Sequence, residues 1–144
     1  MIRAFQRNDL EQCIDLFVAT FAASPWNETW ERSVVRARME QIFETPLFYG
    51  VVSDEGRISG FAMGFSEPWH EGFHFYLKEM CVHPDHQRQG RGTLLMKFLV
   101  EQLQVLGVKR IYLLTARDDL SEAFYSKIGF YVSPKMIMMA QRLE

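Results

Sequence analysis

One stretch, His83-Pro84-Asp85-His86-Gln87-Arg88-Gln89-Gly90-Arg91-Gly92-Thr93, constrains this chain more than any other part of it. The apolar run 76–82 leads into it and the amphipathic run 93–106 leads out, which predicts a strand, a glycine-rich turn and a helix. A helix start presents unpaired N–H groups and the positive end of its dipole. The two glycines leave room for a phosphate and the two arginines add positive charge. The sequence therefore predicts an anion site at this turn.

The kind of phosphate ligand follows from what surrounds the glycines. No Gly-Lys-Ser/Thr follows them, which excludes a Walker A loop, and Leu95 stands where a dinucleotide fingerprint needs a third small residue. The remaining pattern, Gln87-x-x-Gly90-x-Gly92 after Val82-x-Pro84, resembles the acetyl-CoA loop of the GNAT superfamily of N-acetyltransferases. That resemblance implies that the loop amides hold the CoA pyrophosphate. An ordinary helix N-terminus after a glycine-rich turn is the alternative.

Length and composition restrict the class of protein. The 144 residues suit a single domain, residues 1–144, that buries a core without disulfides or metals. A formal net charge of −2 gives no basic field for nucleic acid, and two cysteines are too few for a secreted disulfide scaffold. No signal sequence or membrane-spanning run is visible, so we expect a cytoplasmic protein with no membrane partner. The sequence leaves a homodimer open.

The hydrophobic pattern predicts a mixed α/β fold with the element order β-α-α-β-β-β-α-β-α-β. We expect strands at 2–5, 48–52, 58–66, 73–82, 108–115 and 136–140, with a loop at 67–72. We expect helices from a cap at Asn8 to the break at Ser24-Pro25, and at 28–44, 93–106 and 120–128. The same order occurs in GNAT proteins, which implies a mainly antiparallel sheet with helices on both faces.

The helical spacing also predicts which faces are buried. In the second helix we expect an apolar stripe at Trp30, Val34, Ala37 and Ile42, with a wetter side at Arg32, Arg36, Arg38 and Glu40. In the third we expect Leu94, Leu95, Phe98, Leu99, Leu103 and Leu106 to be buried. Gly107 should end that helix in a left-handed conformation.

A second family signature follows in Tyr125-x-x-x-Gly129-Phe130. The resemblance implies that Tyr125 lies near the CoA sulfur and protonates the departing thiolate. The alternative is a tyrosine that packs at the sheet edge with its hydroxyl hydrogen-bonded. Many members have Asn seven residues before this Tyr, whereas this chain has Asp118, so the resemblance assigns no CoA contact to that side chain.

Glu79 is the candidate general base, or else the anchor of the substrate ammonium. It stands in an otherwise apolar strand three residues before Val82, where GNAT proteins often place such a glutamate. Burial would raise its pKa towards the working range. A surface carboxylate that pairs with Lys78 or with an arginine is the alternative.

The resemblance also implies the contacts of the cofactor. The backbone of Cys81 and Val82 would pair with the pantetheine arm, while the Cys81 thiol is interpreted as a buried side chain without a base to activate it. The predicted CoA-binding residues are Cys81, Val82, Gln87, Arg88, Gln89, Gly90, Arg91, Gly92 and Thr93.

Aromatic residues gather in segments that form the acceptor cleft in GNAT proteins, and aromatic faces can hold a cationic amine. Trp26 and Trp69, together with Glu79, are the predicted substrate contacts; Trp30, Phe73 and Phe75 lie in the same segments. Core packing is the alternative for each aromatic. These segments loosely resemble aminoglycoside 6′-N-acetyltransferases. The four histidines match no zinc spacing, so no metal is expected.

The leading hypothesis is thus an enzyme that transfers acetyl from acetyl-CoA to a primary amine of a small molecule, by direct attack on the thioester. A non-catalytic acyl-CoA-binding or sensor domain is the first alternative, because a fold does not imply an activity. A peptide or protein N-acetyltransferase is the second. The sequence does not identify the acceptor amine.

Overall fold

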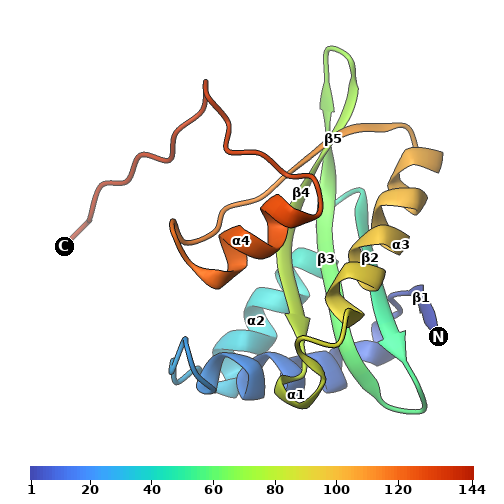
Figure 1. Ribbon diagram of the computed structural model, residues 1–144, viewed down its shortest axis with the longest axis vertical. Helices are drawn as coiled ribbons and strands as arrows, with labels where there is room; N and C mark the ends of the chain where they lie inside the picture. The colour runs from blue at the N-terminus through green and yellow to red at the C-terminus, as the bar shows by residue number, and fades with distance from the viewer. The chain divides into compact units, whose positions relative to one another are not determined.

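The computed structural model describes residues 1–144 and divides into two compact units, Met1–Leu113 and Leu114–Glu144. The first unit contains a five-stranded sheet in the order β1-β2-β3-β4-β5 (Figure 1). Its first four strands pair antiparallel and β5 runs parallel to β4, which confirms the mainly antiparallel sheet. The strands are β1 (Ile2–Ala4), β2 (Phe48–Asp54), β3 (Ile58–Trp69), β4 (Gly72–Val82) and β5 (Val108–Tyr112).

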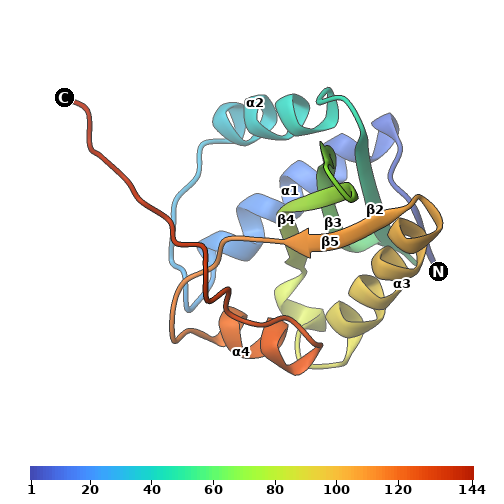
Figure 2. The ribbon, with the colours of Figure 1, turned by 90° about the horizontal axis from the view of Figure 1, so that it is seen from above.

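Helices cover both faces of this sheet, as predicted. Figure 2 shows α1 (Leu10–Ala22) and α2 (Arg32–Phe43) on one face and α3 (Arg91–Val105) on the other. Apolar side chains of α1 and α2 share one buried cluster with Phe61, Met63 and Cys81 of the sheet. No helix of the structure has the length and apolar character that a membrane crossing requires.

A bulge in β4 changes which side chains face which helices. Met63 of β3 lies opposite Glu79, but the next residue, Gly64, lies opposite Leu77, so Lys78 is an extra residue on β4. Neighbouring residues of β3 face opposite sides of the sheet, and their partners do the same. Glu79 therefore shares a face with Met63, towards α1 and α2, while Leu77 faces the other side.

The predicted start of α1 was wrong in detail. The chain first makes a 3-10 turn, Arg7–Asp9, closed by a reciprocal Gln6–Asp9 capping box rather than by Asn8. In that box the Asp9 carboxylate accepts a hydrogen bond of 2.7 Å from the Gln6 N–H. Arg3 also donates two 2.9 Å hydrogen bonds to Asp9. Asp9 forms the capping box in place of Asn8 because the guanidinium of Arg3 compensates the buried charge of Asp9.

The second helix is shorter than predicted and turned by about one position. It begins at Arg32, and its buried residues are Val35, Met39 and Ile42, while Val34 is half exposed. The predicted and the observed buried stripes both consist of apolar residues at helical spacing, so the sequence pattern alone could not show which stripe faces the sheet. This rotation brings Arg38 to the edge of the buried face instead of the open solvent side.

The third helix and its ends agree better with prediction. Its buried residues are Leu95, Met96, Leu99 and Leu103, whereas Leu94 and Leu106 are exposed. Gly107 has a φ of +85°, the left-handed conformation expected after a helix end.

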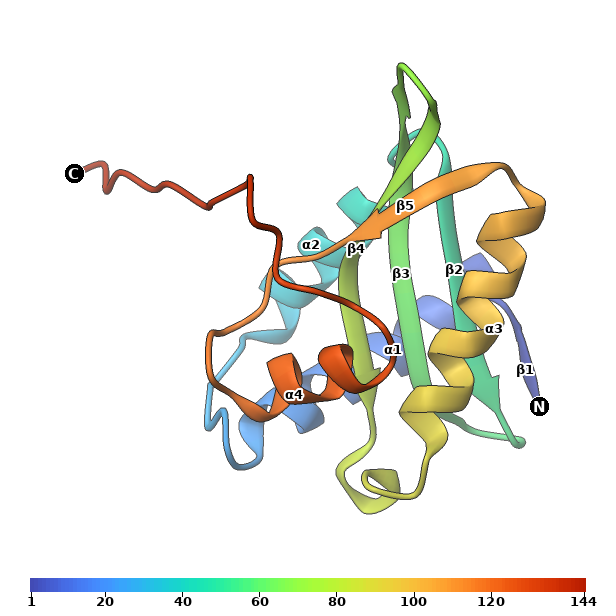
Figure 3. The same cartoon turned by 45° about the horizontal axis from the view of Figure 1, so that its top comes forward.

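The loop predicted at 67–72 is instead mostly strand. Glu67, Pro68 and Trp69 continue β3 and pair with β4, which leaves only His70 and Glu71 in the turn. Proline is tolerated here because β2 pairs with β3 only as far as Phe65, so position 68 needs no hydrogen bond on that side. The result is a long β3–β4 hairpin whose tip extends beyond β2 (Figure 3).

The second unit contains one helix, α4 (Leu120–Lys127), which Asp119 caps through a 2.7 Å hydrogen bond to the Leu120 N–H. Gly129 follows with a φ of +105°, as predicted for a helix end. The strand predicted at 136–140 is wrong: these residues form no strand and their apolar side chains are exposed. The reason is that a strand exists only through ladder partners, and the sheet consists of β1 to β5 alone.

Candidate active site

The glycine-rich loop joins the end of β4 to the start of α3, as the sequence predicted. Gly90 is the N-cap of α3 with a φ of +77°, and Arg88 is also left-handed at +64°. The first intrahelical bond runs from the Leu94 N–H to the Gly90 carbonyl, 3.1 Å, so the N–H groups of residues 91–93 precede it. A side chain at position 90 would meet nothing within 4 Å, so open space lies over this backbone. The loop therefore has the form of an anion site.

Hydrogen bonds within the loop hold this form. The Gln87 side-chain amide donates to the Val82 carbonyl at 2.9 Å, and the Asp85 N–H donates to His83 Nδ1 at 3.1 Å. The Gln89 amide donates to the Asp85 carbonyl at 3.3 Å. Gln87, predicted to contact the cofactor, thus uses its side chain to tie the loop to the strand end.

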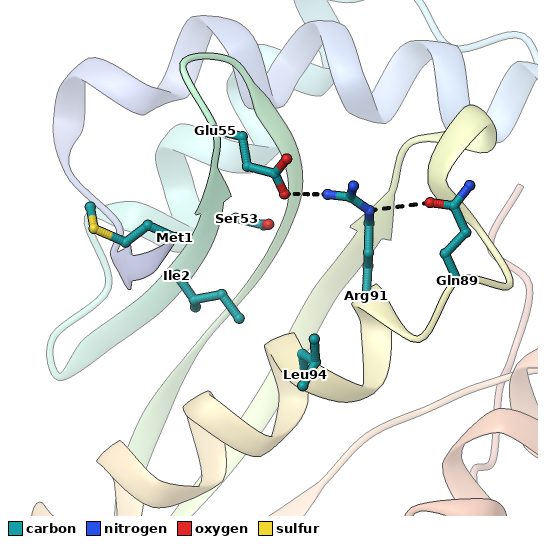
Figure 4. Close-up of a pocket in the computed structure, with 7 residues that line it drawn as sticks. All are labelled: Met1, Ile2, Ser53, Glu55, Gln89, Arg91 and Leu94. Carbon is teal, nitrogen blue, oxygen red and sulfur yellow. Dashed lines mark hydrogen bonds and ion pairs between the residues drawn. The ribbon is translucent and has the colours of Figure 1, made fainter.

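Arg91 pairs with a residue that sequence reasoning did not connect to the loop. Its guanidinium forms an ion pair with Glu55 in the β2–β3 turn and donates a 3.4 Å hydrogen bond to Gln89 (Figure 4). These side chains line a shallow pocket of about 350 Å³ with Met1, Ile2, Ser53 and Leu94. Part of the positive charge predicted for the anion site is therefore compensated by Glu55.

The last residues of β4 extend past its neighbour. β5 pairs with β4 only over Phe73–Tyr76, so residues 77–82 continue beyond that ladder (Figure 3). Within this segment Cys81 is 2% exposed, and burial raises the pKa of its thiol well above the usual value. A neutral buried thiol is a poor nucleophile, so Cys81 can contribute to a cofactor site through its backbone alone.

Glu79 is buried, as the apolar character of its strand suggested. It is 8% exposed, and desolvation raises the pKa of its carboxyl above the ordinary value, while the charge of Arg38 opposes that shift. The bulge at Lys78 turns Glu79 towards α1 and α2, away from the α3 side of the sheet. A buried carboxylate with a raised pKa has the properties of a general base.

Arg38 of α2 is the partner of Glu79. Its Nε donates a hydrogen bond to the carboxylate, and the two groups form an ion pair across 41 positions of sequence. The helical spacing predicts Arg38 on the wetter side of its helix, and the sequence leaves open which arginine could pair with Glu79. Only the register of α2 over the sheet shows which arginine it is.

Two tyrosines and a second carboxylate extend this polar face along the sheet. Tyr76 and Tyr112 stack with ring centroids 4.5 Å apart, and the Tyr112 hydroxyl donates to Glu67 at 2.6 Å. Burial and this hydrogen bond raise the pKa of Tyr112. Strand register puts Tyr76 on the same face as Glu67 and Glu79, and burial, together with these two charges, raises the pKa of Tyr76. The sequence indicated Glu67 as an acidic residue of the acceptor side, but strand register alone brings Tyr76 and Tyr112 to it.

Trp69 lies far from Glu79. It pairs with Gly72 at the start of β4, and a rise of about 3.3 Å per residue puts Glu79 about 23 Å further along the strand. Its ring stacks on His74 at 4.7 Å and remains 52% exposed. The structure thus does not bring these two predicted substrate contacts together.

The other predicted aromatics mostly serve packing. Trp26 follows α1 and packs edge-on against Phe21 at 5.2 Å. Trp30 packs against Phe17 at 5.1 Å, and Phe75 is completely buried. Trp26 and Trp30 both remain partly exposed, and both pack against residues of α1.

Tyr125 belongs to the second unit. It lies in α4, and its carbonyl accepts a 3.0 Å hydrogen bond from the Phe130 N–H. Its ring contacts Phe124 and Phe130 edge-on at 5.2 and 5.5 Å. The Tyr-x-x-x-Gly-Phe pattern is therefore also a local structural unit that folds the chain back after the helix.

Comparison with known proteins identifies relatives along most of the chain. The sequence model of the acetyltransferase (GNAT) family matches residues 10–130. An acetyltransferase of Sodalis glossinidius is 27% identical over 143 residues, which cover 99% of this chain and 94% of that protein. A crystal structure of an aminoglycoside acetyltransferase from an uncultured soil sample, in complex with sisomicin, is 20% identical with a TM-score of 0.75, covering 100% of this chain and 96% of that one. An aminoglycoside N-acetyltransferase in complex with CoA is 17% identical with a TM-score of 0.76, covering 99% and 95%.

Proposed function

The chain belongs to the GNAT family of acetyltransferases, and from that premise we propose that it transfers acetyl from acetyl-CoA to a primary amine of a small molecule. It is an N-acetyltransferase of the acyl-CoA-dependent type. Acetyl-CoA as the donor and a small amine as the acceptor are the proposed parts. The family match spans both compact units, which supports a single catalytic domain over residues 1–144.

The observation that carries the proposal is the buried carboxylate of Glu79 on the strand that enters the glycine-rich loop. An alkyl ammonium titrates near a pKa of about 10 and arrives protonated at neutral pH. It must lose a proton before it attacks a thioester. Glu79 can hold the cation and then receive its proton, directly or through water.

The donor site proposed here is the loop itself. The pyrophosphate of CoA would lie on the backbone N–H groups of residues 88–93, where the dipole of α3 and the open space over Gly90 favour an anion. The pantetheine arm would run along the backbone of Cys81 and Val82, beyond the end of the β4–β5 ladder. The likeness to an acetyltransferase solved with CoA supports this assignment.

In the proposed reaction, the amine nitrogen attacks the thioester carbonyl, a C–N bond forms and the C–S bond breaks. Glu79 takes one proton from the ammonium before attack and releases it to water. The thiolate of CoA receives a proton from Tyr125, and the second proton that the nitrogen loses as the amide forms replaces it on Tyr125 through water. A backbone N–H at the end of β4 would polarise the carbonyl. Glu79 and Tyr125 are the proposed catalytic residues.

A cationic small molecule is favoured as the acceptor. The sheet face that carries Glu79 also carries Glu67 and the stacked pair of Tyr76 and Tyr112, and such aromatic and acidic groups attract ammonium ions. Two structural neighbours are aminoglycoside acetyltransferases, one with the aminoglycoside sisomicin. Trp26 is a further proposed contact, and Trp69 would require an acceptor that spans the length of β4.

An acetyl-CoA turnover screen tests the proposal directly. Release of free CoA thiol would be measured with polyamines, aminoglycosides, amino acids and short peptides, each with acetyl-CoA and with propionyl-CoA. Turnover of small amines with acetyl-CoA is the expected result. Preferential turnover of peptides would indicate a peptide acceptor in place of the proposed small molecule. CoA binding without any turnover would favour a sensor domain.

A further inference from the structure

The ion pair between Arg38 and Glu79 gives Arg38 a role that goes beyond fold stability. We propose that Arg38 is a positioning residue of the acceptor site: its guanidinium orients the Glu79 carboxylate in the free enzyme, and the acceptor ammonium must displace it before transfer. This inference rests on the proposed function for the identity of the incoming cation. In the free enzyme, the Arg38 guanidinium would thus occupy the position that the substrate ammonium takes during the reaction.

The two partners differ in exposure, and this difference determines which one moves. The Glu79 side chain is 9% exposed on β4, where the backbone pairs with Met63 of β3, whereas the Arg38 side chain is 38% exposed on α2. Arg38 contacts the carboxylate through a single donor, Nε, and not through the bidentate pair of hydrogen bonds that binds an arginine more strongly. Its guanidinium can therefore return to water, while the carboxylate stays where the substrate must come.

Arg38 is the main positive charge on this carboxylate. Arg38 acts on Glu79 through charge and through its hydrogen bond, and Lys78 on the same strand acts more weakly. The Lys78 ammonium lies over the Tyr76 ring at 4.7 Å from its centroid. The charge of Glu79 itself acts on Tyr76 and Cys81 of the same strand. Glu67 of β3 acts on that tyrosine and Cys13 of α1 on that cysteine, and none of these four groups carries positive charge.

Two opposite consequences follow from removing the guanidinium. Without its counter-charge the buried carboxylate is harder to ionise, so the Glu79 titration moves to higher pH. Once ionised, however, it has no resident cation, and the substrate ammonium binds without a competitor. A residue that served stability alone would also shift the titration, but its removal would leave the amine KM above the acidic limb unchanged.

The experiment compares Arg38→Gln with Arg36→Gln. Arg36 is a matched control because it lies on the same helix, is 39% exposed and pairs with Glu11, not with Glu79. The Glu79 titration would be followed by 13C NMR of its carboxyl carbon in the free protein. Acceptor KM and kcat would be measured across pH with the best amine from the screen.

For Arg38→Gln we expect the Glu79 midpoint and the acidic limb of kcat/KM to rise by about one to three pH units. Above that limb the amine KM should fall by about two- to fivefold, the equivalent of one partly exposed ion pair. Arg36→Gln should change neither value. Arg38→Lys, which keeps the charge, should restore most of the titration.

Each contrary result has its own meaning. An unmoved Glu79 midpoint in Arg38→Gln would overturn the proposed hold on the carboxylate. A shifted midpoint with an unchanged or higher amine KM above the limb would overturn the displacement by substrate. If the wild-type protein acetylates no amine, the proposed function fails, and displacement fails with it, but the NMR titration still decides whether Arg38 controls Glu79.

Discussion

Gly64 of β3 lies against the carbonyl oxygen of Tyr76 so closely that a Cβ at position 64 would be 1.9 Å from it. This approach occurs next to the bulge at Lys78, where the register of β3 and β4 shifts. The glycine lets the bulged backbone come near, and the bulge turns Glu79 towards α1 and α2. A missing side chain on one strand thus supports the placement of the proposed base on the next.

Gly64→Ala should therefore destabilise the fold and disturb the site. Because the obstacle is backbone and not a flexible side chain, the strands must separate, at a cost of about 3 kcal/mol in the free energy of unfolding. Urea denaturation would measure this loss. Gly60→Ala is the control on the same strand, since its Cβ would meet the Cys81 carbonyl at 3.2 Å and needs only a small shift. Equal losses in both variants would contradict a special role for Gly64.

Gly90→Val should weaken CoA binding tenfold or more, about 1.4 kcal/mol. The valine would occupy the open space over the loop and would also have to adopt a φ of +77°, which a β-branched residue resists. Isothermal titration calorimetry with CoA measures the affinity.

Gly107→Val separates strain from ligand contact. Gly107 also has a positive φ, +85°, with nothing within 4 Å, but it follows the other end of α3. We expect a similar loss of stability and unchanged CoA affinity. A folded Gly90→Val protein that binds CoA like the wild type would refute the proposed pyrophosphate site.

Glu79→Gln should lose activity while it gains stability at neutral pH. The folded-state pKa of Glu79 is raised above its ordinary value of 4.5, so between these two values the folded state binds more protons than the unfolded state. The free energy of unfolding of the wild type therefore falls as pH rises through this window. The glutamine variant does not titrate at this position and lacks this loss of stability. Its free energy of unfolding should therefore exceed that of the wild type by an amount that grows from about pH 4.5 upwards.

Thermal melts of both proteins from pH 4 to 8 would show this divergence, with the exposed Glu71→Gln as control. Parallel stability curves would argue against a raised pKa.

The kinetics of Glu79→Gln distinguish the two roles proposed for Glu79. If Glu79 is the general base, kcat/KM should fall and the acidic limb of its pH profile should flatten. If Glu79 only anchors the ammonium, the amine KM should rise with little change in kcat.

Tyr125→Phe should lower kcat and kcat/KM together by about a hundredfold and leave CoA affinity intact, because the hydroxyl would act only as the thiolate leaves. The ring contacts with Phe124 and Phe130 do not need the hydroxyl, so the helix should remain folded. Tyr131→Phe, at a residue that is 68% exposed, is the control. Wild-type turnover in Tyr125→Phe would exclude the proposed acid.

Features that depend on local chain chemistry could be predicted from the amino-acid order. We could predict the glycine turn, the strand before it and the helix after it, because the signals for these elements lie within a few residues. These signals are glycines that adopt the left-handed conformation and the spacing of apolar residues. For the same reason Gly107 and Gly129 marked helix ends correctly. The apolar strand around Glu79 also predicted that this carboxylate would be buried.

Features that depend on partners distant in sequence could be seen only in the folded chain. The strand predicted at 136–140 has the right composition but no ladder partner, and the register of α2 depends on how the helix packs. Lys78 becomes a bulge only against Gly64, and Arg38 meets Glu79 only when α2 lies over the sheet. Local periodicity carries no information about such pairings, because their free energy arises between elements that the chain brings together only on folding.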